Sequence, residues 1–296
     1  MILKALFERI PAVLCQGSWD TDIASIAMCS KEVTNNSLFI CIKGMEQDGH
    51  QYIQEAAERG AAACLVEEAF WKKSASVHGN LKQAEKKTSA YGELKLPEQM
   101  TIVSVQNTRE AAAWAAAAFY RYPSKELKVI GITGTKGKTS TTFMIRDILE
   151  AAGYKTGLLG TIDYEIGEEK KRAERTTPEA IDIQRYLRKM ADSGCRFAVM
   201  EVSSQGLKLH RSDSILFDVG VFTNLGRDHI GPKEHKDMAE YAHYKSLLFQ
   251  KCCFGIGNID DPYYREIFKD ASCQVCTYSC RQKADVQASD IMLVNG

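Results

Sequence analysis

The chain has 296 residues, which is enough for about two domains of ordinary size, each with its own buried core. Lysine plus arginine (38) equals aspartate plus glutamate (38), so there is no basic field that would attract nucleic acid or a membrane surface. No window of the sequence approaches the ~18 apolar residues of a membrane span. We therefore predict a cytoplasmic protein without membrane insertion and without a nucleic-acid partner.

The first hundred residues alternate short apolar runs with helical patterns. Residues 37–44 and 61–68 are predicted strands, and residues 52–61 form a predicted helix that ends near Gly60. We assign residues 1–106 to a small N-terminal α/β domain. Residues 71–96 are polar, rich in lysine and without a clear period, so we predict a surface insertion or mobile loop there.

A strand and a helix precede the second half of the chain. Residues 101–105 are a predicted strand, and Asn107 or Thr108 is expected to cap a helix that ends before Pro123. We predict that residues 107–127 are a connecting helix and linker. From residue 128 to 296, apolar runs alternate with helical stretches, which is typical of βαβ units and a mostly parallel sheet. The predicted fold class is α/β.

The stretch "GITGTKGKTS" has the appearance of a phosphate-binding loop, although Ile132 stands where the usual pattern has its first glycine. A strand before it and an amphipathic helix after it support that interpretation. Gly134 and Gly137 allow a tight turn whose N–H groups, together with the helix dipole, attract phosphate. Lys138 would add a charge for the β and γ phosphates, and Thr139 a hydroxyl for Mg²⁺. The alternative is an ordinary glycine-containing turn.

Two further strands end in polar residues. In the run 195–202, Glu201 stands at the end of the apolar residues, and the run 218–225 is followed by Asp228 and His229. An acidic residue at a second strand end commonly holds Mg²⁺ in phosphate-loop enzymes, and open α/β sheets bind ligands at this edge. We therefore expect these strand ends and Thr139 to meet.

Five segments, in chain order, resemble the Mur ligases of peptidoglycan synthesis: "GITGTKGKTSTT", "TTPEAIDIQRYLRKM", "MEVSSQGLKLHR", "VFTNLGRDHI" and "EYAHYKSLLF". The branch that adds the third peptide residue is the most similar. That family's loop reads Gly-Thr-x-Gly-Lys-Thr/Ser, which Gly134 to Thr139 match, so Ile132 is no defect. Residues 30–68 resemble the branch's uridine-nucleotide-binding domain, although its Asp-Ser-Arg triplet is here Cys29-Ser30-Lys31.

The resemblance implies an ATP-dependent amide ligase. The γ-phosphoryl group would pass to a carboxylate of UDP-N-acetylmuramoyl-L-Ala-D-Glu, and the amine of a diamino acid, diaminopimelate or lysine, would attack the acyl phosphate. Thr139 and Glu201 would bind one Mg²⁺, and His229 would help to bind a second. Lys245, sixteen positions after His229 (245 − 229 = 16), matches a family lysine that CO₂ converts to a carbamate.

The same resemblance implies the other site residues. The catalytic set is Lys138, Glu201, His229 and Lys245. The ATP-binding set is Gly134, Thr135, Lys136, Gly137, Lys138, Thr139, Ser140 and Asn258. Near the uridine diphosphate we expect Ser30, Lys43, Gly44, Asp48, Gly49 and His50, and near the peptide end Thr176, Thr177, Ser203 and Arg211. The planar guanidinium of Arg211 suits the D-Glu carboxylate, His210 is expected to be a packed or surface histidine, and Gln205 stands where many relatives have histidine.

The chain ends inside what resembles the central domain, so we expect an incomplete central domain, no C-terminal ligase domain, and a monomeric fragment without full activity. Two alternatives remain open. One is another amide ligase with this central domain, such as a folylpolyglutamate synthase or cyanophycin synthetase relative; the other is a non-catalytic ATP-binding remnant. Cys273, Cys276 and Cys280 lack a fourth zinc ligand at suitable spacing, so buried or free thiols are preferred.

Overall fold

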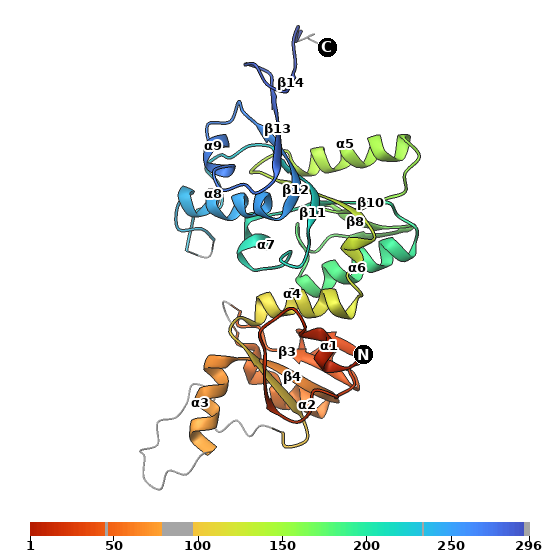
Figure 1. Ribbon diagram of the computed structural model, residues 1–296, viewed down its shortest axis with the longest axis vertical. Helices are drawn as coiled ribbons and strands as arrows, with labels where there is room; N and C mark the ends of the chain where they lie inside the picture. The colour runs from red at the N-terminus through yellow and green to blue at the C-terminus, as the bar shows by residue number, and fades with distance from the viewer. Residues whose placement is uncertain (45–46, 79–96, 233, 293–296) are drawn as a thin grey trace. The chain divides into compact units, whose positions relative to one another are not determined.

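The protein forms two compact units, Met1–Arg121 and Tyr122–Gly296. The structure is a computed structural model that describes residues 1–44, 47–78, 97–232 and 234–292 (Figure 1). None of the helices that it describes is both long enough and apolar enough to cross a membrane. Each unit is described by itself below.

The first unit contains a five-stranded sheet of order β1-β5-β4-β3-β2. Among its described strands, β1 is antiparallel to β5 and the other pairs are parallel. Every residue of β3 and β5 is buried, as expected for parallel strands covered on both faces. The strands are β1 (Val13–Gln16), β2 (Ser25–Ala27), β3 (Ser37–Ile40), β4 (Ala61–Glu67) and β5 (Thr101–Val105).

The helices of the first unit are α1 (Leu3–Leu6), α2 (Ile53–Glu58), α3 (Glu68–His78) and α4 (Thr108–Phe119), with 3₁₀ turns η1 (Ser30–Glu32) and η2 (Gly49–Tyr52). Helix α4 begins where the sequence predicts, because the Asn107 side chain accepts hydrogen bonds from the first-turn N–H groups. The sequence interpretation set this helix apart as a connection. In the structure α4 packs on α1 and β4 within the first unit.

The polar stretch after β4 differs from the prediction at its start. Residues up to His78 continue helix α3 instead of forming a loop. Phe70, which is buried in the core of the first unit, anchors the helix. On its surface Glu68 and Lys72, one turn apart, form an ion pair of 2.5 Å within the helix. The rest of the predicted insertion, residues 79–96, lies outside the described residues.

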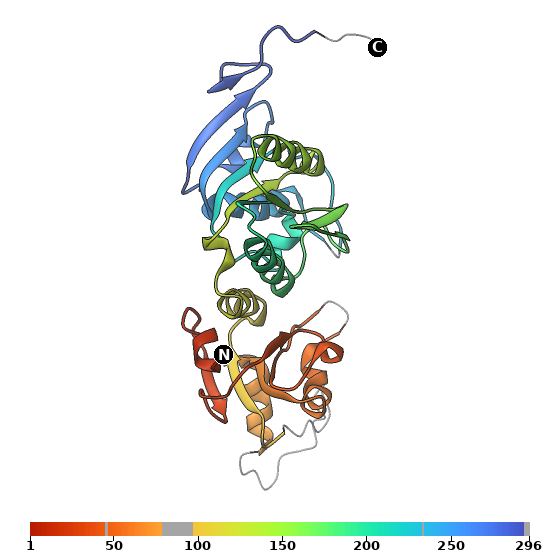
Figure 2. The same cartoon turned by 90° about the vertical axis from the view of Figure 1, so that its right-hand side faces the viewer.

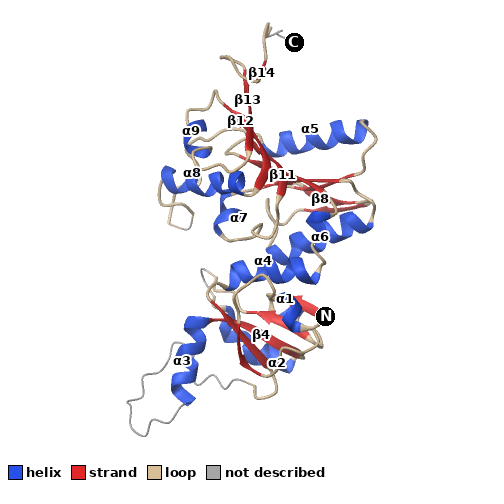
Figure 3. Cartoon of the chain, viewed as in Figure 1, coloured by secondary structure: helices blue, strands red, loops and turns tan. Residues whose placement is uncertain are grey.

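The second unit is built on a nine-stranded sheet of order β14-β13-β12-β11-β6-β10-β7-β8-β9 (Figure 3). The described strands from β14 to β7 run parallel, and β8 and β9 form an antiparallel edge. The strands are β6 (Lys128–Thr133), β7 (Thr156–Leu159), β8 (Asp163–Ile166), β9 (Glu169–Arg172), β10 (Phe197–Glu201), β11 (Phe217–Phe222), β12 (Cys252–Asn258), β13 (Gln274–Ser279) and β14 (Val286–Gln287).

Helices cover both faces of this sheet (Figures 1 and 2). Helix α5 (Lys138–Ala151) covers a small apolar cluster of residues from β6, β10 and β11 on one face. The larger core lies on the other face, under α6 (Ala180–Asp192), α7 (Ser204–Lys208), α8 (Met238–Ser246) and α9 (Tyr264–Ile267), with 3₁₀ turns η3 (Pro123–Lys125) and η4 (Leu247–Gln250). The predicted α/β class is confirmed, and the neighbouring strands β11, β6 and β10 all end at one edge.

Candidate active site

The phosphate-binding loop leaves the end of β6 at Gly134. This glycine has φ +151°, and a Cβ added there would lie 1.9 Å from the Thr223 hydroxyl oxygen at the end of β11. Glycine is therefore required for the loop to pass so close to its neighbour. Asn224 then holds the loop, since its side chain accepts from the N–H of Lys136 and donates to the Lys136 carbonyl, at 3.0 Å each.

Helix α5 begins directly after the loop. Its N-cap residue is Gly137, at φ +82°, and a glycine supplies no side chain to cap the first turn. The first-turn N–H groups and the helix dipole thus remain suited to an anion. Lys138 lies back across the loop, where its Nζ donates to the carbonyls of Gly134 (2.9 Å) and Thr135 (3.1 Å). Burial lowers the pKa of Lys138, although Glu201 opposes that shift.

Glu201 ends β10 and is 1% exposed. Its Oε1 accepts a hydrogen bond of 3.0 Å from the Thr139 hydroxyl, so the structure brings these two predicted residues together. Carboxylate and hydroxyl oxygens suit Mg²⁺, which usually takes few protein ligands plus phosphate oxygens. Among the described residues there is no preformed group of three or more His, Cys, Asp or Glu that could hold a metal. The pair therefore fits a magnesium ion shared with a nucleotide.

Thr161 is a site residue that sequence reasoning missed. Its N–H donates to Glu201 Oε1 at 2.8 Å, and its hydroxyl donates to Glu201 Oε2 at 3.1 Å. The residue follows β7, which pairs in parallel with β10. No motif marks it, but the end of a further parallel strand at the same edge was a signal that could have found it.

Lys245 lies on α8 and is 1% exposed. Its Nζ donates to the carbonyl of Gly134 at 2.8 Å and lies 4.5 Å from the ring centroid of Tyr241. Burial, and secondarily the positive charge of Lys138, holds the pKa of Lys245 well below its ordinary value of 10.5. The structure thus places this predicted residue against the phosphate-binding loop, with its amine shifted toward the neutral form.

Tyr241 joins several of these groups and was also missed. Its hydroxyl lies 3.2 Å from that of Thr135 in the loop, and its ring centroid is 6.0 Å from that of His229. His229 is half-exposed, with φ +55°, and its Nδ1 lies 2.7 Å from Glu234 Oε1. Lys245 and His229 therefore both lie near the Tyr241 ring, while Glu201 lies with Thr139 and Thr161.

The predicted peptide-binding residues form a corner beside Glu201. The Thr177 hydroxyl donates to the Glu201 carbonyl (2.9 Å) and accepts from the N–H of Ser203 (3.0 Å). Ser203 in turn caps α7, since its side chain accepts from the N–H of Gly206. The hydroxyls of Thr176 and Thr161 lie 3.1 Å apart. Three of the four predicted peptide residues are thus connected to Glu201: Thr177 and Ser203 through its backbone carbonyl, and Thr176 through Thr161.

Arg211 has a different environment from the one expected. Its guanidinium is mostly buried and donates to both carboxylate oxygens of Glu179, at 3.1 and 2.7 Å. It also donates to the carbonyl of Thr177 at 3.0 Å. The planar face predicted to take a D-Glu carboxylate therefore already binds a carboxylate of the chain itself.

Asn258, at the end of β12, uses its amide within the sheet. Its Nδ2 donates to the carbonyl of Thr223 (2.8 Å), and its Oδ1 accepts from the N–H of Asp260 (3.0 Å). Asn258 therefore fixes the end of β12 next to β11. Through its bond to Thr223 it also holds the end of β11, which lies against the phosphate-binding loop.

The predicted uridine-site residues lie in the first unit, around one turn. His50 is buried, with its Nδ1 2.5 Å from Asp48 and its Nε2 accepting from the N–H of Glu67 at 3.0 Å. The backbones of Lys43 and Asp48 form an isolated antiparallel bridge across the turn. The histidine therefore uses both ring nitrogens to hold the turn in place. The other members are also fixed: Gly44 donates to Gln47, Gly49 donates to Ile42, and Ser30 donates to Glu55.

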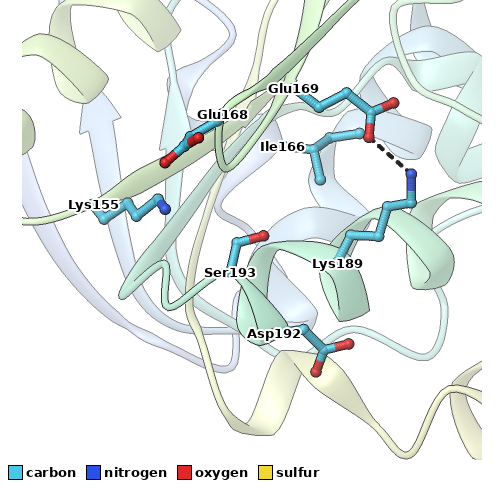
Figure 4. Close-up of a pocket in the computed structure, with 7 residues that line it drawn as sticks. All are labelled: Lys155, Ile166, Glu168, Glu169, Lys189, Asp192 and Ser193. Carbon is cyan, nitrogen blue, oxygen red and sulfur yellow. Dashed lines mark hydrogen bonds and ion pairs between the residues drawn. The ribbon is translucent and has the colours of Figure 1, made fainter.

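A surface pocket lies away from these residues, at the edge where the parallel strands begin (Figure 4). Its volume is about 520 Å³. Lys155 precedes β7, and Lys189, near the end of α6, pairs with Glu169 at 2.9 Å. None of the predicted site residues lines it. The cysteines of the described chain are free, including the predicted thiols of Cys273, Cys276 and Cys280.

A parallel sheet with a phosphate-binding loop after one strand and a buried acid at the end of the next defines a P-loop nucleotide-binding α/β protein. The comparison with known families is more specific. Residues 132–295 match the Mur ligase middle domain, and residues 22–120 match the catalytic domain of the Mur ligase family. The chain belongs to the Mur ligase family, which confirms the resemblance seen in the sequence.

The chain is similar to ligases named for diaminopimelate addition. It is 39% identical over 295 residues to UDP-N-acetylmuramoyl-L-alanyl-D-glutamate–2,6-diaminopimelate ligase 2 of Clostridium acetobutylicum, covering 99% of this chain and 56% of that protein. The Bacillus licheniformis ligase of this name is 39% identical over 300 residues, covering 98% and 55%. The chain therefore spans about half the length of the curated relatives it matches.

Solved structures support the fold. A structure of a UDP-N-acetylmuramoyl-L-alanyl-D-glutamate–2,6-diaminopimelate ligase superposes with a TM-score of 0.73 at 21% identity, covering 98% of this chain and 55% of the other. MurF from Acinetobacter baumannii gives 0.59 at 21% identity, covering 99% and 55%. At this level of identity the likeness is one of fold alone.

Proposed function

We propose that the protein acts as an ATP-dependent ligase that extends UDP-N-acetylmuramoyl-L-Ala-D-Glu by diaminopimelate through an acyl phosphate. The names of its relatives favour diaminopimelate over lysine. The observation that carries the proposal is the bond between the Thr177 hydroxyl and the carbonyl of Glu201. It ties the candidate acceptor corner to the backbone of Glu201, whose side-chain carboxylate lies against the phosphate-binding loop, and phosphoryl transfer to an acceptor carboxylate requires such proximity.

The loop residues would bind and orient the nucleotide. Residues Gly134 to Ser140 offer backbone N–H groups and the positive end of α5 to the phosphates, and Lys138 can turn its ammonium from the loop carbonyls to a phosphate oxygen. Thr139 and Glu201 would hold Mg²⁺, which when bound offsets the repulsion between the γ-phosphate and the acceptor carboxylate. In this proposal Asn258 acts by fixing the strand end beside the loop.

Lys245 would carry a carbamate. Its low pKa favours the neutral amine, and the lone pair of that amine can form an N–C bond with CO₂ as one N–H proton leaves. The product is an anion, which would turn the repulsion between Lys245 and Lys138 into an attraction. His229, whose ring centroid lies 6.0 Å from that of Tyr241, would hold a second cation together with this carbamate.

The peptide end of the acceptor would be bound by residues of the second unit. Thr176, Thr177 and Ser203 lie at the corner beside Glu201, and Arg211 would exchange its bonds to Glu179 for bonds to the D-Glu carboxylate. In the first unit, the turn residues Lys43, Gly44, Asp48 and Gly49 would contact the uridine diphosphate, with Ser30 nearby. His50 would act by holding that turn in its binding conformation.

Calorimetric titration of the chain with ADP and Mg²⁺ tests the nucleotide site. We expect saturable binding that Lys138→Met weakens by about 10- to 100-fold, because a charge-assisted bond contributes about 1.5–3 kcal/mol. Lys155→Met is the control, since Lys155 lines the pocket at the opposite edge of the sheet. Equal affinity of the wild type and Lys138→Met would contradict the proposed site.

A further inference from the structure

We propose that Thr161 is a positioning residue that fixes the Glu201 carboxylate for Mg²⁺ and connects it to the acceptor corner. The identity of the cation rests on the proposed function. The placement of Glu201 by Thr161 rests on the hydrogen bonds of the second unit alone.

Thr161 contacts both oxygens of the carboxylate. Its backbone N–H donates to Oε1 at 2.8 Å and its hydroxyl donates to Oε2 at 3.1 Å, while Thr139 donates to Oε1 at 3.0 Å. A carboxylate has about four acceptor sites, so these bonds occupy three of them. Two donors on Oε1 and one on Oε2 fix the plane of the group and leave Oε2 as the oxygen best suited to a cation.

The chain is shaped for this contact. A Cβ at position 160 would lie 2.7 Å from Glu201 Oε1, so a side chain there would push the carboxylate aside, and Gly160 leaves room for it in its present position. The carboxylate is 1% exposed, and a buried charge is costly unless hydrogen bonds compensate it. The N–H and hydroxyl of the residue that follows Gly160 supply that compensation.

The same hydroxyl reaches the acceptor corner. Thr161 Oγ1 lies 3.1 Å from Thr176 Oγ1 and 3.1 Å from Glu201 Oε2. Thr161 has one hydroxyl proton, and the anionic carboxylate is the stronger of the two acceptors. The Thr161 hydroxyl therefore donates its proton to Glu201. Its contact with Thr176 holds the loop before α6 at a fixed distance from the cation site.

The test is calorimetric titration of the whole chain with ADP, once with Mg²⁺ and once with EDTA. Thr161→Val removes the hydroxyl at nearly constant volume, and Thr161→Ser restores it. Thr156→Val is the matched control. Thr156 begins the same strand, is buried, and donates its hydroxyl only to a neighbouring carbonyl, that of Tyr154 at 3.1 Å, among its described contacts. Melting temperatures check that each variant is folded.

We expect Thr161→Val to reduce the gain in ADP affinity that Mg²⁺ produces by about 10-fold, as is typical when a group that orients a metal ligand is lost. Its affinity in EDTA should remain within about twofold of wild type. Thr161→Ser and Thr156→Val should behave as wild type.

The proposal is overturned if Thr161→Val keeps the full magnesium gain, if it loses affinity equally with and without Mg²⁺, or if Thr161→Ser fails as Thr161→Val does. A wild-type chain that binds no ADP in either buffer would instead contradict the proposed function. It would also contradict the proposed dependence of magnesium binding on Thr161. The two failures are therefore distinguishable.

Discussion

The Nζ of Lys245 donates a hydrogen bond of 2.8 Å to the carbonyl of Gly134, across a sequence separation of 111 residues. The bond joins helix α8 to the first residue of the phosphate-binding loop. A change in the charge of this amine therefore changes the electrostatic potential at the loop that is proposed to bind the nucleotide.

If Lys245 forms a carbamate, ¹³C-labelled bicarbonate should produce a carbamate resonance in the NMR spectrum of the wild-type chain. We expect Lys245→Met to abolish this resonance. Among the described lysines, Lys245 is the one that is buried and whose pKa is held well below its ordinary value. Lys155→Met should retain it. A resonance that survives in Lys245→Met would assign the carbamate elsewhere.

The two loop glycines should tolerate alanine very differently. Gly134→Ala would place a Cβ 1.9 Å from the Thr223 hydroxyl, whereas at Gly137 a Cβ meets open space among the described residues. We expect Gly134→Ala to abolish measurable ADP binding. Gly137→Ala should cost only about 1 kcal/mol of left-handed backbone strain, or roughly fivefold in affinity. Similar affinities of the two variants would show that the close approach to Thr223 does not shape the loop.

Glu179 should compete with the acceptor for Arg211. We expect Glu179→Gln to strengthen binding of UDP-N-acetylmuramoyl-L-Ala-D-Glu by about threefold, since it removes the anion that competes for the buried Arg211. The Glu179 side chain is 24% exposed, and a pair screened by solvent contributes up to about 1 kcal/mol. Arg211→Lys should weaken binding by about 10-fold, because lysine cannot bind both oxygens. Calorimetry measures the affinity of both variants. The control is Asp182→Asn, which removes the carboxylate of the exposed pair between Asp182 and Arg185. Weaker binding by Glu179→Gln would mean that Glu179 only positions Arg211.

Asp213 should make stability depend on pH. Burial raises the pKa of this carboxyl, but His210 (2.6 Å) and Lys251 (2.5 Å) outweigh it and hold the pKa below the ordinary 3.8. For an acid with a lowered folded pKa, the contribution is complete above the unfolded pKa and is lost as pH falls through the folded one. Asp213→Asn should therefore lower the melting temperature at neutral pH by about 2–8 °C.

The difference between wild type and Asp213→Asn should shrink as the pH falls below about 3.8. Asp270→Asn, at an exposed position, is the control and should leave the melting temperature unchanged. A difference that stays constant from neutral pH to acid would show that the charge of Asp213 contributes nothing.

The sequence predicts the strands and loops that form the site better than it predicts the contacts between side chains there. Apolar runs locate β6, β10 and β11, and the rule that parallel strands end at one edge brings Thr139 to Glu201, 3.0 Å apart. These features depend on local patterns and on sheet geometry, which short stretches of sequence encode. The family motif adds Lys245. Hydrophobic periodicity alone would not have shown that this lysine is buried.

Side-chain partners were harder to foresee. Arg211 binds Glu179 across 32 residues, His50 binds the N–H of Glu67 across 17, and Thr161 binds Glu201 across 40. Each pair comes from segments that only the folded sheet brings together, and each residue type has many suitable partners in the chain. Hydrogen-bond complementarity of this kind is a property of the packed structure and has no periodic signal in the sequence.

The most direct test of the account is calorimetric titration of the chain with UDP-N-acetylmuramoyl-L-Ala-D-Glu, compared with UDP-N-acetylmuramic acid that lacks the dipeptide. We predict saturable binding of the dipeptide form, weakened in Thr177→Val, which removes the hydroxyl that bonds Glu201 and Ser203. The form without the dipeptide should bind more weakly and be unaffected by that substitution. Absence of binding of the dipeptide form by a folded chain that still binds ADP and Mg²⁺ would contradict the account.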